Sequence, residues 1–286
     1  MAGKKLDPNK RRLWIGTSGY SYPEWIEAGF YPPETKSAHM LNIYAHRFPV
    51  TELNYTWYQL PKADALLRMQ NLVPAEFRFA AKLTRTLTHE VDSTQWRTQA
   101  ARYRDGIAPL VQSGQLMAVL VQLAPGFERS RENRQYLAAL LDELAGLPLA
   151  VEFRHRSWIQ PRVFEELSRR QVAVVAVDEP TLPHLLPPLN VLTSPNLFYI
   201  RFHGRNTAGW RSGHMQKKFD YRYSDAELAE WIERFIAPMA KQAKNGLLFF
   251  NNHVRGQAPQ NAETLTRLLV RQGFEVMPPP HATRLS

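Results

Sequence analysis

The chain of 286 residues is 44% hydrophobic and 22% charged, a balance typical of a soluble globular protein. It contains no cysteine, which excludes disulfide bonds, thiolate nucleophiles and cysteine-ligated zinc. Its formal net charge of +10 favours anionic partners, such as nucleic acid or phosphorylated metabolites.

The first residues of the chain, 1–12, are basic and have no apolar core, so they do not read as a secretory signal. We expect them to form a disordered arm. No apolar run anywhere in the sequence approaches the ~18 residues needed to span a membrane. We therefore expect a cytoplasmic protein without a membrane partner.

Eight short apolar runs rich in β-forming residues follow along the chain, and each ends in polar residues. These predicted strands are 13–17, 50–55, 77–82, 117–123, 149–154, 172–178, 198–203 and 247–252. Segments of helical periodicity lie between most of them, at 37–48, 61–71, 130–145, 157–170, from a capping box at 224–227 onward, and 259–272.

Strand and helix alternate about eight times at roughly 30-residue spacing, which predicts a single α/β domain, a (β/α)₈ TIM-like barrel. We assign residues 13–277 to this barrel and residues 278–286 to a carboxyl-terminal tail. The rival architecture is a doubly wound open sheet, whose Gly-x-Gly-x-x-Gly phosphate-binding signature is absent here.

Two stretches depart from the alternation. Residues 179–196 contain five prolines and predict an irregular connection between strands six and seven. Residues 204–223 form a long basic and aromatic loop after strand seven. Because barrel active sites lie at the carboxyl ends of the strands, this loop is interpreted as a lid or ligand clamp, with a plain surface loop as the alternative.

Polar side chains at these strand ends should meet at one mouth of the barrel, where we expect a phosphate-bearing ligand to be bound or processed. The candidates for proton transfer are two carboxylates and an imidazole, namely Glu152, Asp178 and His203. The candidates for substrate binding are Glu52, Asn54, Lys82, Arg154, Arg201, Arg205, Asn251 and Asn252.

The fifth predicted strand carries the clearest signal. Glu152 and Arg154 stand two residues apart, so both project from one face of that strand. Buried charges are costly unless they pair or meet a ligand. Glu152 with Arg154, or Glu52 with Lys82, is therefore also open to interpretation as a structural ion pair.

The sequence leaves open whether the protein is an enzyme; if it is, a hydrolase or phosphoester-processing enzyme is favoured. Two other functions also remain open. One is a non-catalytic nucleic-acid-binding protein, and the other is a glycoside hydrolase that uses two carboxylates. We expect no cofactor. A divalent-metal set is the less favoured alternative, because no tight ligand spacing supports it; it would consist of Glu152, Asp178, His203 and His253.

Several motifs carry a resemblance to a known family: IGTSGYSY at 15–22, ELN at 52–54, VEFR at 151–154, YIRFHGR at 199–205 and FNN at 250–252. Over about residues 13–275 the chain resembles the YecE-like family, domain-of-unknown-function family seventy-two. The resemblance implies a TIM-like barrel without a settled activity. It also implies a structural likeness to apurinic endonuclease barrels, hence to DNA binding, although the histidines of their metal site are few here.

Overall fold

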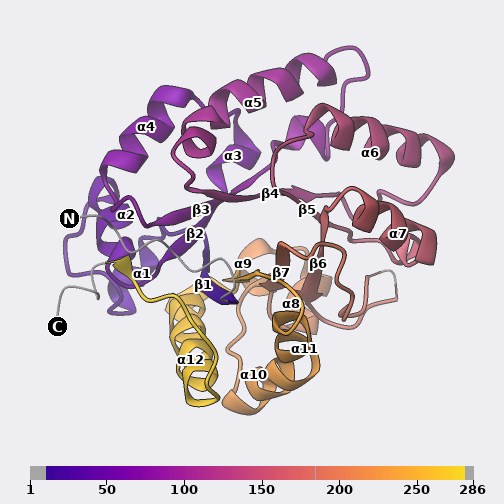
Figure 1. Cartoon of the computed structure of the whole chain (residues 1–286). Helices are drawn as coiled ribbons and strands as arrows, with labels where there is room; N and C mark the ends of the chain where they lie inside the picture. Colours follow the sequence, from indigo (N-terminus) through magenta and orange to yellow (C-terminus); the bar gives the residue numbers. More distant parts are fainter. Residues whose placement is uncertain (1–10, 184, 281–286) are drawn as a thin grey trace.

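A computed structural model describes residues 11–183 and 185–280 (Figure 1). Eight parallel strands close into a barrel in sequence order, with β1 paired to both β2 and β8. The predicted barrel is thus confirmed. The strands are β1 Arg12–Ser18, β2 Val50–Leu53, β3 Arg78–Lys82, β4 Leu116–Gln122, β5 Leu149–Glu152, β6 Ala173–Asp178, β7 Leu197–Phe202 and β8 Asn245–Phe250.

The longer helices surround this barrel as an outer ring (Figure 1). The longer ones are α2 Ser37–Ala45, α4 Ala63–Asn71, α5 Trp96–Gln112, α6 Arg131–Glu143, α7 Pro161–Arg169, α10 Asp225–Trp231 and α12 Gln257–Arg271. The short ones are α1 Glu24–Glu27, α3 Tyr55–Tyr58, α8 Thr207–Ser212, α9 Met215–Lys218 and α11 Ala237–Ala240. A π-helical segment, Ile232–Ile236, joins α10 to α11, and 3₁₀ turns occupy Arg85–Leu87, Arg156–Trp158 and Val254–Gly256.

The structure agrees with some of the predicted local features and differs from others. The capping box before α10 is present, since Ser224 accepts from the Glu227 N–H and Glu227 accepts from the Ser224 N–H. The proline-rich connection 179–196 has neither helix nor strand in its described part. Helix α5 was not predicted, because Gly106 and Pro109 interrupt its helical pattern. The stretch 204–223, interpreted from the sequence as a long basic and aromatic loop, contains the short helices α8 and α9.

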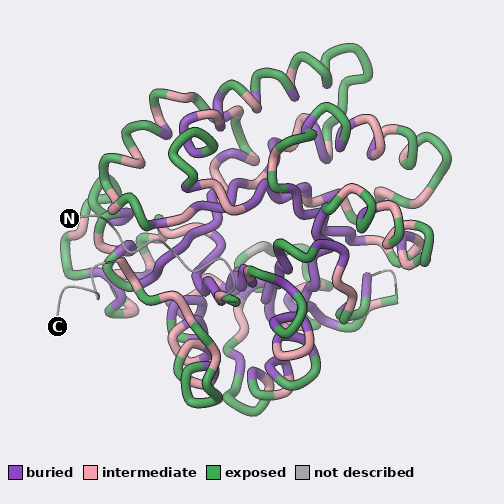
Figure 2. The backbone as a smooth tube through the Cα atoms, in the orientation of Figure 1, coloured by how far each residue is buried: buried purple, intermediate pink, exposed green. Residues whose placement is uncertain are grey.

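The core has two parts separated by the barrel wall, and the strands are buried along most of their length (Figure 2). Alternate strand residues pack inside the barrel, and the intervening ones pack under the helices. On β6, for example, Val175 and Val177 belong to the inner cluster, whereas Val174 and Ala176 belong to the outer one. This alternation determines which strand-end side chains reach the mouth.

The predicted arm 1–12 and tail 278–286 lie mostly outside the described residues, which begin at 11 and end at 280. Strand β1 begins at Arg12, one residue before the predicted barrel boundary. Within the described part of the chain, none of the helices combines the length and apolar character that a membrane-spanning segment needs.

Candidate functional site

A cleft of about 610 Å³ lies at the carboxyl ends of the strands. This volume suits a small ligand. The cleft is lined by seven of the predicted site residues: Glu52, Asn54, Lys82, Arg154, Arg201, His203 and Asn251. A hollow of about 670 Å³ lies at the opposite barrel end, but its one charged lining residue, Arg170, is paired with Asp142 and Glu166. The charged cleft is therefore the candidate site.

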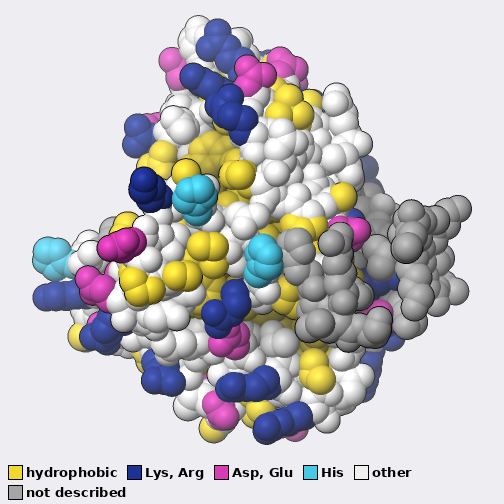
Figure 3. All heavy atoms as spheres, turned by 90° about the vertical axis from the view of Figure 1, so that its left-hand side faces the viewer, with side chains coloured by type: hydrophobic (Ala, Val, Ile, Leu, Met, Phe, Trp, Pro, Cys, Tyr) yellow, Lys and Arg dark blue, Asp and Glu magenta, His cyan; other side chains and the backbone are white. Residues whose placement is uncertain are grey.

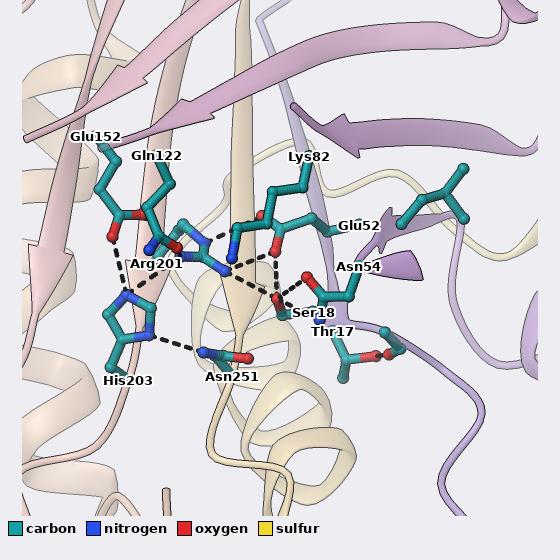
Figure 4. A network of polar contacts seen from close by, with 12 residues as sticks. Thr17, Ser18, Glu52, Asn54, Lys82, Gln122, Glu152, Arg201, His203 and Asn251 are labelled. Carbon is teal, nitrogen blue, oxygen red and sulfur yellow. Dashed lines mark hydrogen bonds and ion pairs between the residues drawn. The ribbon is translucent and has the colours of Figure 1, made fainter. Parts of the chain in front are cut away.

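Arg201, on β7, lies at the centre of the polar network beneath the cleft (Figure 4). Its Nε and Nη2 donate to the two oxygens of Glu52 at 3.0 and 2.7 Å, and Nη2 also donates to Ser18 Oγ at 2.9 Å. Its Nη1 donates to Glu152 Oε2 at 2.7 Å and to Gln122 Oε1 at 3.1 Å. These contacts use all five guanidinium N–H groups.

The prediction that Arg201 holds a phosphate is therefore wrong, because no donor of this side chain is left for a ligand. Arg201 is 1% exposed. Burial alone would lower the pKa of Arg201, but the carboxylates of Glu152 and Glu52 outweigh this effect and raise it. The residue ties four other strands together and stays charged.

Glu152 and His203 meet on the inner face of the barrel. Glu152 Oε1 accepts from Arg154 Nη1 at 2.8 Å and lies 3.4 Å from His203 Nε2. Burial raises the pKa of Glu152, but Arg201, His203 and Arg154 hold it well below its usual value. Burial and Arg201 lower the pKa of His203. Near neutral pH this pair is thus a carboxylate and a neutral imidazole, which Asn251 contacts at Nδ1 over 2.9 Å.

Four predicted site residues do not line the cleft: Glu152, which lies in the network beneath it, and Asp178, Arg205 and Asn252. Both oxygens of Asp178 accept from Arg205 Nε, at 2.9 and 3.0 Å. Asn252 donates to the Tyr221 carbonyl and to Asn261 Oδ1, at 2.7 and 2.9 Å. Asp178 lies two residues after the outer-facing Ala176 of β6, and Asn252 lies two residues after the outer-facing Phe250 of β8. The strand alternation therefore turns both side chains away from the barrel interior.

Sequence reasoning missed Glu179, which lies one residue beyond β6. Its Oε2 lies 2.7 Å from Arg154 Nη2. Burial raises the pKa of Glu179 to about 7, although Arg154 opposes this shift. Counting in steps of two from Val175 and Val177 leads to this position rather than to Asp178. The alternation was therefore a usable signal.

Lys82 ends β3 and presents its ammonium to the cleft. Its Nζ lies 4.8 Å from the centre of the Trp57 ring and has no hydrogen-bond acceptor in the described part of the chain. Burial, followed by repulsion from Arg201, lowers the pKa of Lys82 to about 7. Burial, followed by Lys82, lowers the pKa of His89 to about 4. The expected structural pair of Glu52 with Lys82 does not form, because Arg201 occupies Glu52.

Replacing Lys82 with methionine should give a variant more stable than the wild type at pH 6.5, with a difference that shrinks towards pH 9.5. Below about pH 7 the folded protein bears the cost of a buried ammonium. Between about 7 and the ordinary value of 10.5, only the unfolded chain binds this proton, so wild-type stability rises with pH. Urea unfolding of both proteins at the two pH values measures the effect.

The comparison between variants is needed because Glu179 and Lys218 also titrate in this range. Lys62→Met, at an exposed lysine, is the control and should differ from the wild type equally at both pH values. An unchanged difference for Lys82→Met would show that Lys82 keeps an ordinary pKa.

Aromatic side chains form the rest of the cleft wall. The lining includes Tyr20, Tyr22, Tyr55, Trp57, Tyr58 and Phe219. Tyr22 stacks on His253 with ring centroids 4.6 Å apart and planes 10° apart. Such rings provide flat apolar faces beside the charged floor of the cleft, an arrangement suited to a ligand with both polar and planar or apolar parts.

The metal set considered from the sequence is not assembled. His253 Nδ1 lies 3.2 Å from Glu24 Oε1, and Asp178 is turned away from His203 towards Arg205. Among residues 11–183 and 185–280, no group of three or more histidine, aspartate and glutamate side chains is placed to hold a metal ion. We therefore propose no metal chemistry at this cleft.

A family model described as protein of unknown function DUF72 matches residues 14–284. The UPF0759 protein YunF of Bacillus subtilis is 28% identical over 271 residues, which cover 90% of this chain and 94% of YunF.

Two solved structures are similar throughout. A DUF72 family protein of Thermotoga maritima has a TM-score of 0.82 and 32% identity, and the match covers 91% of this chain and 100% of that one. A DUF72 family protein of Enterococcus faecalis has a TM-score of 0.80 and 29% identity, with 90% and 95% covered.

Proposed function

The chain belongs to the DUF72 family of proteins of unknown function, and from this premise we propose that its cleft binds a small ligand bearing a phosphate or carboxylate group. The observation that carries the proposal is the imbalance of charge in the described cleft lining. Its basic side chains are Lys82, Arg154, Arg201 and Lys218. Arg154 and Arg201 are paired with Glu52, Glu152 and Glu179, whereas Lys82 and Lys218 make no ion pair within the described residues. Glu52 is already fully engaged by Arg201.

Arg154 and Lys218 are the side chains best suited to hold the anionic group. Arg154 pairs with Glu152 and Glu179, yet its Nε is buried without a hydrogen-bond partner in the described structure. Lys218 Nζ lies 3.8 Å from the centre of the Trp210 ring, and Arg154 Cζ lies 5.2 Å from the same centre.

Charge repulsion supports the same assignment. Burial, followed by Arg154, lowers the pKa of Lys218 to about 8. An anion placed between Arg154 and Lys218 would relieve this repulsion. The short helix α9, which ends at Lys218, would then act as the ligand clamp expected from the loop 204–223.

The glycoside hydrolase alternative receives no support from the network. Glu52 and Glu152 both bind Arg201, and each carboxylate is fully buried. Neither carboxylate is free to attack a sugar carbon, and the lowered pKa of Glu152 makes it unsuited to donate a proton near neutral pH. We do not propose this activity.

The nucleic-acid alternative would require basic side chains gathered over an extended surface. On the face shown in Figure 3, lysine and arginine side chains are scattered among acidic and apolar ones. The charge excess described above lies inside a cleft of about 610 Å³. We therefore favour a small ligand and keep a single-stranded oligonucleotide as one arm of the test.

Binding should be measured by calorimetry with inorganic phosphate and glycerol 3-phosphate, using glycerol at matched ionic strength as the neutral probe. We expect the phosphates to bind and glycerol not to bind. Lys218→Met should weaken phosphate binding about tenfold, the effect of losing one charge-assisted hydrogen bond. The matched control is Lys217→Met, because Lys217 is the exposed neighbour of Lys218.

Equal affinities for the Lys218→Met and Lys217→Met proteins would contradict the assignment of Lys218. Absence of any phosphate or carboxylate response in the wild type would reject the small-anion proposal. Strong oligonucleotide binding that falls steeply with salt would favour the nucleic-acid alternative instead.

A further inference from the structure

We propose that Lys82 is an amine nucleophile that forms an imine with an aldehyde or ketone whose anionic group is held by Arg154 and Lys218. The inference rests on the proposed anion-binding function and adds the chemical class of the ligand. It assigns Lys82 a role different from that of the other cations in the cleft, namely covalent bonding to the ligand.

The position of Lys82 carries the argument. Its side chain ends β3 and extends towards the polar network at the barrel mouth, in a cleft large enough for a small ligand (Figure 4). The two carboxylates that would ordinarily neutralise it are Glu52 and Glu152, and both are bound to Arg201. Lys82 makes no ion pair within the described residues, and its nearest aromatic partner is Trp57.

The surroundings favour the unprotonated amine. Burial and the neighbouring Arg201 lower the pKa of Lys82 to about 7, so a large part of the population carries a lone pair on Nζ at neutral pH. Desolvation beside another cationic group is a general way to activate a lysine for imine formation. A lysine needed only as a cation would be better placed beside a carboxylate.

A proton carrier lies close to the same aromatic ring. The His89 and Trp57 ring centroids are 5.1 Å apart, while Lys82 Nζ lies 4.8 Å from the Trp57 centroid. Burial and Lys82 keep His89 neutral by lowering its pKa to about 4. Its Nδ1 contacts Thr88 Oγ1 at 2.9 Å, so the imidazole is held in one orientation within the cleft.

The step balances without any oxidant or reductant. The Nζ lone pair attacks the carbonyl carbon, and the electrons of the carbon–oxygen π bond move to oxygen, which takes a proton. Nitrogen loses a proton, which gives a carbinolamine. The hydroxyl oxygen then takes a second proton, the nitrogen lone pair forms the carbon–nitrogen double bond as the carbon–oxygen bond breaks, and the oxygen leaves as water. The resulting iminium loses its N–H proton. The products are the imine and one water molecule.

Reductive trapping tests the inference on the full chain. The protein is incubated separately with dihydroxyacetone phosphate, pyruvate and unphosphorylated dihydroxyacetone, each in the presence of cyanoborohydride, which reduces an iminium to a stable secondary amine. We expect one adduct per chain from the two anionic ketones, located at Lys82 by peptide mass spectrometry. Dihydroxyacetone should label Lys82 at least tenfold less.

Two variants complete the design. Lys82→Arg keeps a positive charge but cannot form the imine, and it should abolish the adduct. Lys62→Arg, at an exposed lysine, should leave the yield unchanged. Because the adduct is located in the wild-type protein, the test does not depend on how well the variants fold.

The possible failures can be told apart. If phosphate binds in the calorimeter but neither anionic ketone labels Lys82, the imine proposal is overturned and the anion-binding function stands. If Lys82 is labelled equally by dihydroxyacetone and its phosphate, the amine is reactive without the anion site, and the combined proposal fails at that site. Labelling spread evenly over the exposed lysines would also overturn the imine proposal.

Discussion

Replacing Arg201 with methionine is expected to lower the free energy of unfolding by about 3–5 kcal/mol, the usual effect of removing one partner from a buried ion pair. The substitution would leave Glu52 and Glu152 as unpaired buried carboxylates, since each is 0% exposed. It would also remove the links from β7 to Ser18 and Gln122. Urea unfolding at neutral pH, followed by tryptophan fluorescence, measures this effect.

A matched surface change shows whether the loss comes from burial. Arg234→Met removes an exposed pair with Glu230 on one helical face and should cost at most about 1 kcal/mol. Adding Glu52→Gln to the Arg201→Met protein should recover part of the lost stability, because it removes an unpaired buried charge. If Arg201→Met and Arg234→Met cost the same, the network beneath the cleft is not what holds the barrel mouth together.

The second large effect is expected at Gly16, in the middle of β1. A Cβ at this position would lie 2.1 Å from the Val50 carbonyl oxygen and 3.0 Å from the Tyr44 hydroxyl. The carbonyl belongs to the neighbouring strand β2, so it cannot move aside as a flexible side chain would. Gly16→Ala should therefore cost at least about 3 kcal/mol, the upper end of the range for overpacking a core.

The same substitution would disturb the site through Tyr44. Its hydroxyl lies 2.8 Å from the backbone nitrogen of Thr17, the residue before the Ser18 that contacts Glu52 and Arg201. Thermal unfolding of Gly16→Ala can be compared with Gly126→Ala, whose added Cβ meets nothing within 4 Å. The Gly126 variant should match the wild type within about 0.5 kcal/mol. Equal stability of the two variants would show that β1 and β2 separate more easily than their register indicates.

The architecture was largely readable from residue order, for reasons visible at particular strands. Parallel barrel strands are buried on both faces, so runs such as 172–178 are nearly continuous in apolar residues. Polar residues then mark the strand ends, which led to Glu52, Glu152, Arg154 and His203. Helix α5 escaped prediction because Gly106 and Pro109 interrupt its helical pattern. The glycine stands where the helix packs closely against Pro61, a contact that local helical preference does not reveal.

The sequence predicted less reliably which of two neighbouring polar residues faces the cleft. Asp178 was preferred to Glu179 because it ends the apolar run, yet the pleat turns Glu179 towards Arg154 and leaves Asp178 with Arg205. Asn251 faces His203, whereas its neighbour Asn252 contacts Asn261 outside the barrel. One residue along a strand reverses the direction of a side chain, so an error of one position in the strand end exchanges a cleft residue for a structural one.

Residue order was thus sufficient to predict strand–helix alternation, a closed barrel and a polar mouth, because these depend on local periodicity and on burial that is the same along each strand. It was insufficient to show which charges remain available there. Arg201 meets Ser18, Glu52, Gln122 and Glu152 from positions 183, 149, 79 and 49 residues away. Closure of the barrel brings these four side chains within 3.1 Å of Arg201. Because the energy of an ion pair depends on distance and burial, this closure pairs Arg201 with the carboxylates and leaves Lys82 unpaired among the described residues.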